Sequence, residues 1–461
     1  MVALRRCPQK KVKDTLKALP KDLDETYAHI LKDIAETASS DDVIRLLKCL
    51  SVAIRPLRVE ELAEVFALEF DGPEGAPPEL SDRRSLEDRE RDVVSICSSL
   101  ITLVDNDDSS VIQFSHFSVK EFLTSRRLSE EKYKDISQFH IDDEQAHTTL
   151  AQACLGTLLG LDDSSKLKHY ASRFWVEHAQ FGTVSSRITI GMHRLFDSAD
   201  PYFAAWLKLH DIDQKKDQDI DKEIYDRWGY ESADRGSPLY YASLCGFCDL
   251  AAHFISQDQE QVNARGGRCH FPLAAALYNK HNDVATLLRQ HDAAVDAPLQ
   301  FASADGRNDV VRQLLLDHGA NPDSQQDGRQ SPICLATVNG HPDVVQTLLD
   351  HGVRVNAVDG AADNLLRLAT FYASLRVYRK KTRIDLLTHP LMAHFQTCNN
   401  PTDILAVLRS QAQFEQSTSR DDTLTRCLDS TIHVLHAFST ALASGTGVEQ
   451  VNSILLPRSH I

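Results

Sequence analysis

Two cysteines and a nearby Cys-His pair are the first residues in this chain whose types and spacing could support chemistry. Cys245 and Cys248 have the C-x-x-C spacing of a redox or zinc motif, and Cys269-His270 follows a little later. A redox C-x-x-C needs a strand before it and a helix after it, and a zinc site needs four ligands at fixed spacing. Neither pattern is met, so we expect ordinary buried or half-buried cysteines.

Three histidines recur near the ends of successive predicted helices: His291, His318 and His351. They could suggest a ladder of metal ligands. A histidine at a helix C-terminus has a simpler role, because it can hydrogen-bond the last carbonyls and meet the negative end of the helix dipole. We therefore expect no metal site.

The common catalytic signatures are absent from the sequence. It contains no G-x-S-x-G, no H-E-x-x-H and no phosphate-binding G-x-x-x-x-G-K-[ST]. We expect no catalytic residues, no cofactor and no enzymatic activity from these 461 residues.

The elements that position these residues repeat along the chain. Four copies of a proline-led pattern begin at Pro238, Pro272, Pro298 and Pro332. The spacing shows that one connection between copies is shortened. A period in the thirties is typical of a solenoid, in which each unit buries its apolar face against its neighbours and the array offers an extended surface. The pattern therefore favours recognition of a protein over catalysis.

The repeat resembles the ankyrin repeat. Proline opens the first helix, and a glycine eight residues later permits a left-handed turn into the second helix. Gly246, Gly306 and Gly340 meet this expectation, whereas Lys280 stands at that place in the second copy. An aspartate suits the start of each second helix because of the helix dipole. These aspartates are Asp249, Asp283, Asp309 and Asp343.

The resemblance implies that the binding surface is the concave face, made by the hairpin tips and the solvent side of the first helices. Carried over by position after each proline, the candidate protein-binding residues are Leu244, Cys245, Tyr278, Asn279, Ala304, Asp305, Val338 and Asn339, with Asp327 and Arg329 at a hairpin tip. Aromatic, Asp, Asn and Arg side chains there are plausible anchors.

The N-terminal third has a different pattern. Helical periodicity predicts helices over 11–19, 22–34, 42–52 and 59–67. Alternation then predicts two strands, 99–104 and 111–114, joined by a turn rich in Asp and Asn. A further helix follows, with Ser118 and Glu121 spaced as in a capping box. Helices followed by a hairpin favour a winged helix.

Residues 19–27, 55–62, 114–123 and 170–178 resemble fungal NACHT–ankyrin proteins of the STAND class of signalling ATPases. The middle two stretches are similar to a winged-helix module that is often labelled after GPI inositol-deacylases. The resemblance implies that His116 is a latent nucleotide-sensor position. The simpler interpretation is a histidine that packs or caps at the start of the 117–124 helix.

A winged helix can read DNA, but the charge of this one opposes that role. Residues 41–130 carry 11 Lys/Arg and 19 Asp/Glu, and the helix at 59–64 is acidic. Phosphates would be repelled. We therefore expect a structural role and no nucleic-acid partner.

The C-terminal residues 389–447 resemble the Goodbye domain, which is found at the N-terminus of fungal STAND proteins. Here it follows the repeats, which suggests a rearranged gene or a reading frame that joins two neighbours. The uncertain linker 361–388 contains the one dense basic cluster, Arg376, Arg379, Lys380, Lys381 and Arg383. This cluster could serve nuclear import, although short basic runs are usually solvated faces.

The sequence as a whole predicts a mainly α fold: a helical/winged-helix module, an ankyrin-repeat solenoid and a C-terminal helical module. The expected domains are 1–40 (helical remnant of an ATPase end), 41–130 (winged helix), 131–230 (helical spacer), 231–360 (four ankyrin repeats), 361–388 (linker) and 389–447 (Goodbye-like). The net charge is −16, ten cysteines are scattered, and no apolar run is long enough to cross a bilayer. We expect a cytoplasmic scaffold that binds a protein partner. The alternative is the regulatory part of a nucleotide-dependent signalling ATPase.

Overall fold

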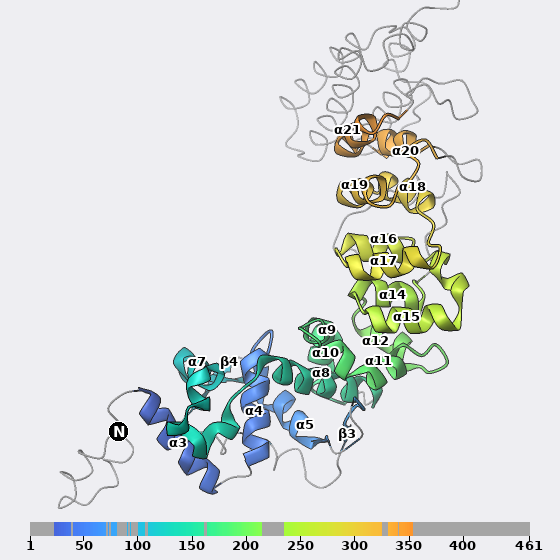
Figure 1. Ribbon diagram of the computed structural model, residues 1–461. Helices are drawn as coiled ribbons and strands as arrows, with labels where there is room; N and C mark the ends of the chain where they lie inside the picture. The colour runs from blue at the N-terminus through green and yellow to red at the C-terminus, as the bar shows by residue number, and fades with distance from the viewer. Residues whose placement is uncertain are drawn as a thin grey trace, which may run out of the picture. The chain divides into compact units, whose positions relative to one another are not determined.

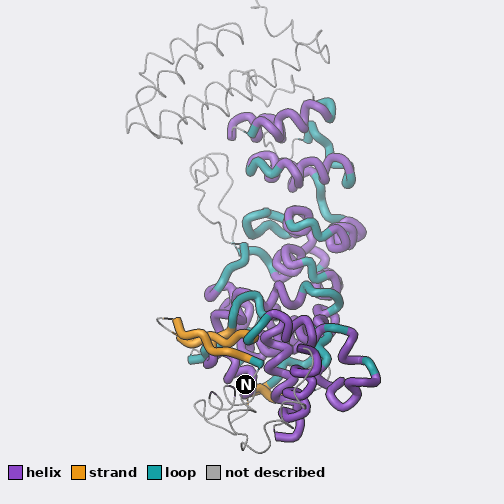
Figure 2. Tube along the Cα trace, turned by 90° about the vertical axis from the view of Figure 1, so that its left-hand side faces the viewer, coloured by secondary structure: helices purple, strands orange, loops and turns teal. Residues whose placement is uncertain are grey.

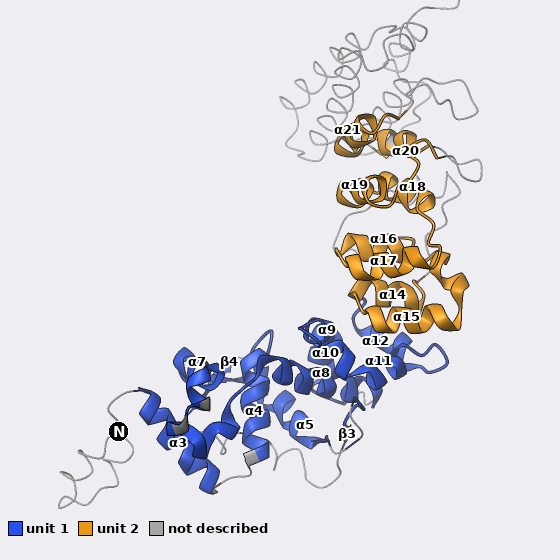
Figure 3. Cartoon of the chain, viewed as in Figure 1, with its two compact units in different colours: residues 1–214 blue, residues 215–461 orange. Residues whose placement is uncertain are grey.

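The protein is mainly helical, and a computed structural model divides it into two units, residues 1–214 and 215–461 (Figures 1 and 3). The structure describes residues 23–37, 40–70, 72, 75–80, 90, 93, 100–106, 109–160, 164–213, 235–324, 331–339 and 341–353. The predictions for 11–19, for the linker with its basic cluster, for the Goodbye-like module, and for Gly340, Asp327 and Arg329 lie outside these residues.

The first part of unit 1 is a winged helix preceded by a helix. Its elements are α3 (Leu23–Thr37), α4 (Ser40–Val52), β1 (Leu57–Arg58), α5 (Val59–Ala67), β2 (Leu68–Glu69), β3 (Glu79–Leu80), β4 (Ile101–Asn106), β5 (Ser109–Phe114) and α7 (Phe117–Thr124). The predicted helices 22–34, 42–52 and 59–67 are confirmed, with bounds that differ by three residues at most.

The small sheet of unit 1 has the order β1-β5-β4, with both pairs antiparallel (Figure 2). Leu103 lies opposite Ile112, and Ile112 in turn lies opposite Leu57, so one row of apolar side chains crosses all three strands. The predicted hairpin is confirmed. Its strands extend further than the sequence indicated, to Asn106 and back to Ser109.

The predicted capping box at α7 is wrong. The N-cap is His116, whose Nδ1 accepts from the backbone N–H of Ser118 at 3.3 Å. The Ser118 hydroxyl instead lies 2.7 Å from His116 Nδ1 and 2.7 Å from the hydroxyl of Tyr27 on α3. The capping interpretation of His116 is therefore correct, and the serine links α7 to the preceding helix.

The second part of unit 1 is a helical spacer. Its elements are η2 (Arg126–Ser129), η3 (Glu131–Phe139), α8 (Asp143–Leu159), α9 (Lys168–Ala179), α10 (Val184–Arg187), α11 (Thr189–Phe196) and α12 (Tyr202–Leu209). Trp175, Phe196 and Trp206 form its aromatic core, with the two indole rings 5.3 Å apart. The indole N–H of Trp206 donates to the Ser172 carbonyl at 3.0 Å.

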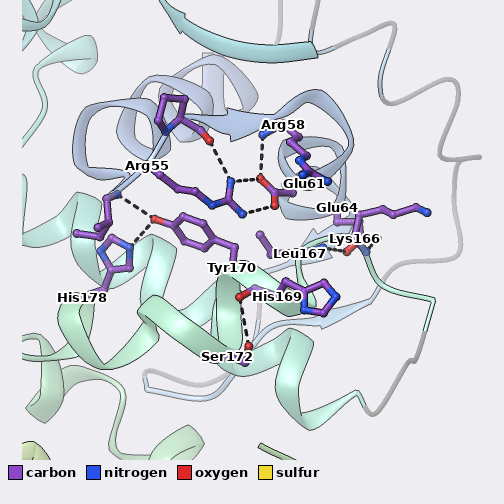
Figure 4. A network of polar contacts seen from close by, with 12 residues as sticks. Arg55, Arg58, Glu61, Glu64, Lys166, Leu167, His169, Tyr170, Ser172 and His178 are labelled. Atoms are coloured by element: carbon purple, nitrogen blue, oxygen red, sulfur yellow. Dashed lines mark hydrogen bonds and ion pairs between the residues drawn. The ribbon is translucent and has the colours of Figure 1, made fainter. Parts of the chain in front are cut away.

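Within the winged helix, an ion pair links Arg55, directly before β1, to Glu61 on α5 (Figure 4). The guanidinium of Arg55 donates to both oxygens of Glu61, at 2.8 and 2.5 Å, and the side chain of Glu61 is only 3% exposed. Glu61 also accepts from the Arg58 N–H at 2.8 Å at the start of α5. The bidentate hydrogen bond with Glu61 raises the pKa of Arg55. Removing Arg55 would leave the buried carboxylate of Glu61 uncompensated.

A second carboxylate of α5 holds the spacer. Glu64 accepts from the Ser165 hydroxyl at 2.6 Å and from the backbone N–H groups of Lys166 and Leu167, directly before α9. These N–H groups lie at the positive end of the α9 dipole, where a carboxylate is stabilising. Glu61 and Glu64 of α5 therefore both bind other parts of unit 1.

A buried polar chain continues from this region into the spacer. The Tyr170 hydroxyl accepts from the Ile54 N–H at 3.2 Å and lies 2.8 Å from Nε2 of His178. Nδ1 of His178 lies 2.8 Å from Nδ1 of His147. If Tyr170 donates to Nε2, then neutral His178 can donate from Nδ1 to His147, and every contact is satisfied. Burial, and secondarily His147, lower the pKa of His178 to about 3.

The hydrogen-bonded side chains of Tyr170, His178 and His147 make unit 1 sensitive to acid. The pKa of His178 falls from 6.5 to about 3 on folding, so its neutral form stabilises the fold above pH 6.5, and that stability is lost as the pH falls towards 3. We expect the free energy of unfolding of unit 1 to drop by about 2 kcal/mol between pH 7 and pH 5. Amide hydrogen exchange in α8 and α9 measures this change.

His178→Gln is the matched control, because a glutamine oxygen can accept from Tyr170 but does not titrate. The variant should lose protection in α8 and α9 less steeply with acid than the native chain does. An equal pH slope in both proteins would show that the histidine is not responsible.

The described residues of unit 2 form four helix pairs stacked in chain order (Figure 1). They are α14 (Pro238–Cys245) with α15 (Cys248–Gln257), α16 (Pro272–Tyr278) with α17 (Asn282–Gln290), α18 (Asp296–Ala304) with α19 (Asn308–Leu316), and α20 (Pro332–Asn339) with α21 (Pro342–Asp350); η4 (Gln259–Asn263) follows α15. The shortened connection is residues 291–295, between α17 and α18.

The turn chemistry expected of these pairs is confirmed at the described positions. Gly246 and Gly306 have φ of 76° and 73°, and Lys280 adopts the same left-handed conformation at 64°. A lysine there is strained, whereas glycine is not. In the third pair the helix begins at Asp296, so Pro298 is not its first residue.

Each turn glycine supports a histidine of the following repeat. A Cβ built on Gly246 would lie 2.4 Å from the ring of His281, and one on Gly306 would lie 2.4 Å from the ring of His341. The ring of His341 donates from Nε2 to the Ala304 carbonyl at 2.9 Å. Glycine is therefore favoured at these positions for two reasons. The backbone has positive φ, and a histidine ring occupies the space that a Cβ would need.

Gly306→Ala should destabilise the last two repeats more than Gly319→Ala does. Both glycines have positive φ, so both variants carry about 1–2 kcal/mol of backbone strain. A Cβ at Gly319 meets nothing within 4 Å, whereas one at Gly306 displaces His341 from its hydrogen bond. Hydrogen exchange across α18–α21 should therefore show the larger loss of protection in Gly306→Ala. Equal losses would mean that the ring contact contributes nothing.

Candidate interaction surface

Four of the residues that we predicted to face solvent on the first helices are buried. Leu244, Cys245, Ala304 and Asn339 are 5%, 1%, 3% and 7% exposed. The first helices lie between neighbouring repeats, so most of their residues form contacts from repeat to repeat. The prediction of a solvent-facing role is wrong for these four. The side chain of Val338 is not among those described.

The asparagines bind the preceding repeat. The amide of Asn339 donates to the Ala304 carbonyl at 2.9 Å, and that of Asn279 donates to the Leu244 carbonyl at 2.7 Å. These carbonyls end the first helices and need donors. Asn279 is partly solvent-facing while it makes this bond, whereas Asn339 is enclosed. Both residues therefore have a structural task, which the carried-over surface pattern did not predict.

Asp305 lies in a nearly buried ion pair. Its side chain is 6% exposed, and its carboxylate lies 3.2 Å from Nε of Arg307 and 3.8 Å from Nε2 of His270. The prediction that Asp305 faces solvent is therefore wrong, because its carboxylate is enclosed and holds Arg307 in place.

Tyr278 is the one candidate among those described whose large side chain is open to solvent, at 41%. Two guanidinium groups flank its ring, with Arg307 4.8 Å and Arg268 5.3 Å from the centroid. The Tyr278 hydroxyl accepts from Arg268 at 3.1 Å. Stacked guanidinium groups are held in place by cation–π attraction. The result is an exposed aromatic ring in a pre-organised cationic setting.

The long loop before α16 completes this arrangement. Arg307 donates to the Arg268 carbonyl at 2.9 Å, which ties the loop to the start of α19. In the same loop, Arg265 lies over the Phe301 ring at 4.7 Å, and His270 packs on that ring at 4.3 Å. We call this arrangement the loop face. Its solvent-accessible members are Arg265, Arg268 and Tyr278, and they rest on His270, Phe301, Asp305 and Arg307, whose side chains are buried or nearly so.

Sequence reasoning missed the arginines of the loop face. Arg307 occupies the position after the turn glycine, where the second and fourth repeats carry His281 and His341. That departure from the repeat was visible in the sequence. Arg265 and Arg268 flank two glycines in the loop, and no function was assigned to this pattern from the sequence.

The other motifs behave as ordinary structure. Cys245 is buried and Cys248 half-buried, and neither forms a disulfide. His351 Nδ1 lies 2.7 Å from the Thr347 carbonyl, as expected of a histidine at a helix C-terminus. Within the described residues, no group of three or more His, Cys, Asp or Glu could hold a metal ion.

Comparison with known families supports both halves of this architecture. Residues 31–133 match the GPI inositol-deacylase winged helix domain, and residues 273–359 match ankyrin repeats in three copies. The first helix pair, α14 and α15, lies before the ankyrin match but has the same proline, left-handed glycine and second-helix aspartate. The protein therefore combines a winged helix of this type with ankyrin repeats, in the order that the sequence predicted.

One curated relative is the azaphilone pigments biosynthesis cluster protein L of Monascus ruber. It is 32% identical over 307 residues. The matched region spans 61% of this chain and 61% of that protein. In the part of the chain that the structure describes, no helix is long and apolar enough to cross a membrane.

Arg307→Met should lower the free energy of opening the loop of residues 264–271 by about 3 kcal/mol. The reason is that the enclosed carboxylate of Asp305 loses its guanidinium partner. Adding Asp305→Asn in that background should recover part of the loss, since the unpaired charge is then removed. Hydrogen exchange of residues 264–271 reports the effect. Strictly additive losses in the double variant would show that the two side chains do not interact.

Proposed function

We propose that this protein is a non-enzymatic interaction scaffold whose ankyrin array binds a protein partner through the loop face. Ankyrin repeats support a protein-interaction role, because a stacked array presents an extended surface and no closed pocket. The finer assignment rests on the loop face itself.

The observation that carries this proposal is the exposure of Tyr278 between two arginines. Elsewhere on the first helices, the candidate side chains that the structure describes are buried or hydrogen-bonded to the preceding repeat. Tyrosine and arginine are enriched among residues that dominate binding energy. Because these side chains are held in place before binding, they lose little conformational entropy when a partner binds.

We further propose that the scaffold acts in a STAND-like signalling context in the cytoplasm. The support is the winged-helix match followed by ankyrin repeats, and cysteines that are free wherever they are described, which suits a reducing compartment. The engagement of Glu61 and Glu64 inside unit 1 supports a structural role for the winged helix over DNA binding.

A second candidate function is regulation of a nucleotide-dependent ATPase. It is favoured by the winged-helix type and by the exposed His116 at the N-terminus of α7. Such a chain would act on an ATPase domain that these residues do not contain, since they lack a Gly-rich phosphate loop. The sequence encoded upstream of Met1 distinguishes the two candidates, because only the second requires that loop nearby.

A photo-crosslinking amino acid at position 278 should capture the partner, because Tyr278 lies at the centre of the loop face. The same amino acid in place of Leu316 is the matched control. Leu316 is 62% exposed but ends the second helix α19. We expect a specific adduct from the full chain in cell extract at 278 and none at 316. Equal or absent adducts at the two positions would contradict the proposed binding surface.

A further inference from the structure

The loop face has a charge that differs from that of the chain. The protein carries a net charge of −16. Among the loop-face residues, three guanidinium groups (Arg265, Arg268 and Arg307) stand against the single carboxylate of Asp305. Three exposed aspartates of these repeats, Asp249, Asp283 and Asp309, lie in the first turns of the second helices instead. Positive charge is therefore concentrated where the exposed aromatic ring lies.

The arginines are positioned by several independent contacts. Arg307 bonds the Arg268 carbonyl and the Asp305 carboxylate, and it stacks on Tyr278. Arg268 also lies over this ring and donates to its hydroxyl. The Arg307 side chain is only 11% exposed, and its nitrogens are bonded to Asp305, Cys269 and the Arg268 carbonyl, so it has a positioning role. Arg268 is therefore the guanidinium that meets a ligand. The ring of Tyr278 holds it in one orientation, and its fork matches a carboxylate.

We propose that the loop face recognises an acidic segment of the partner protein, with an Asp or Glu side chain next to Arg268 and an apolar side chain against Tyr278. This inference rests on the proposed function and adds the chemistry of the partner. Charge complementarity carries it, because a cationic, aromatic surface on an otherwise acidic protein attracts an anionic segment.

A protein segment fits better than a nucleic acid. Binding to a phosphate backbone needs an extended basic footprint, with several cations following the strand. The loop face has three guanidinium groups, one of which is paired with Asp305, and the surrounding protein is acidic. This charge matches a few carboxylates and repels a long polyanion.

The test is selection of binders from a library of random 12-residue peptides on the immobilised full chain. We expect the native protein to enrich peptides with Asp or Glu at fixed positions beside an apolar residue. Arg268→Glu should lose that enrichment, and the affinity of the selected acidic peptide should fall at least tenfold. Replacing its Asp and Glu by Asn and Gln should weaken binding to a similar degree.

Arg312→Glu is the matched control, since it makes the same charge change at an exposed position on the second helix α19. It should bind the acidic peptide as the native protein does. If Arg268→Glu loses hydrogen-exchange protection in the repeats, Arg268→Gln replaces it in the same comparison.

Three results would overturn the inference: selected peptides without acidic positions, equal peptide binding by Arg268→Glu and Arg312→Glu, or displacement of the peptide by an equimolar single-stranded oligonucleotide. If these occur while position 278 still crosslinks to a protein, the acidic-partner inference fails and the proposed binding surface stands. Failure of the crosslink itself would refute the binding surface.

Discussion

The carbonyl groups at the ends of the first helices govern how the repeats are joined. A helix end buried between neighbours must find hydrogen-bond donors, and the following repeat supplies them. The Leu244 carbonyl accepts from Asn279, and the Ala304 carbonyl accepts from Asn339 and His341. The glycines of the turns leave room for the histidine rings. Positions that a surface pattern assigns to binding are therefore occupied by this joining function.

The junction between the second and third repeats departs from that rule, and the loop face arises from the departure. The connection of residues 291–295 is too short for a hairpin, and α16 packs less against α18 than α14 does against α16. Arg307 replaces the histidine and binds the loop around Arg268 instead of a first-helix carbonyl. Tyr278 is left exposed as a result, so one irregularity in the array accounts for both the aromatic ring and its cations.

Much of the fold could be predicted from the sequence because its signals are local. Proline, glycine and aspartate at fixed offsets specify the helix pairs, and alternation specifies the hairpin of the winged helix. The candidate site could be predicted only in part, through Tyr278. The burial of Asn339 depends on a carbonyl 35 positions away, and the roles of Arg268 and Arg307 depend on a contact between two repeats. Similarly, the chain of Tyr170, His178 and His147 joins segments whose proximity no periodicity reveals.

The sparsely packed junction between the second and third repeats also gives the ankyrin array a mechanical property. Four repeats joined by equal junctions would bend as a uniform rod, whereas this array consists of two well-packed pairs connected where packing is least extensive. In such a stack each repeat is stabilised by its neighbours, so bending and opening concentrate at the weakest junction. Arg307 and the loop around Arg268 bridge that junction. A ligand on the loop face would contact the first two and the last two repeats at once and would restrict bending between them.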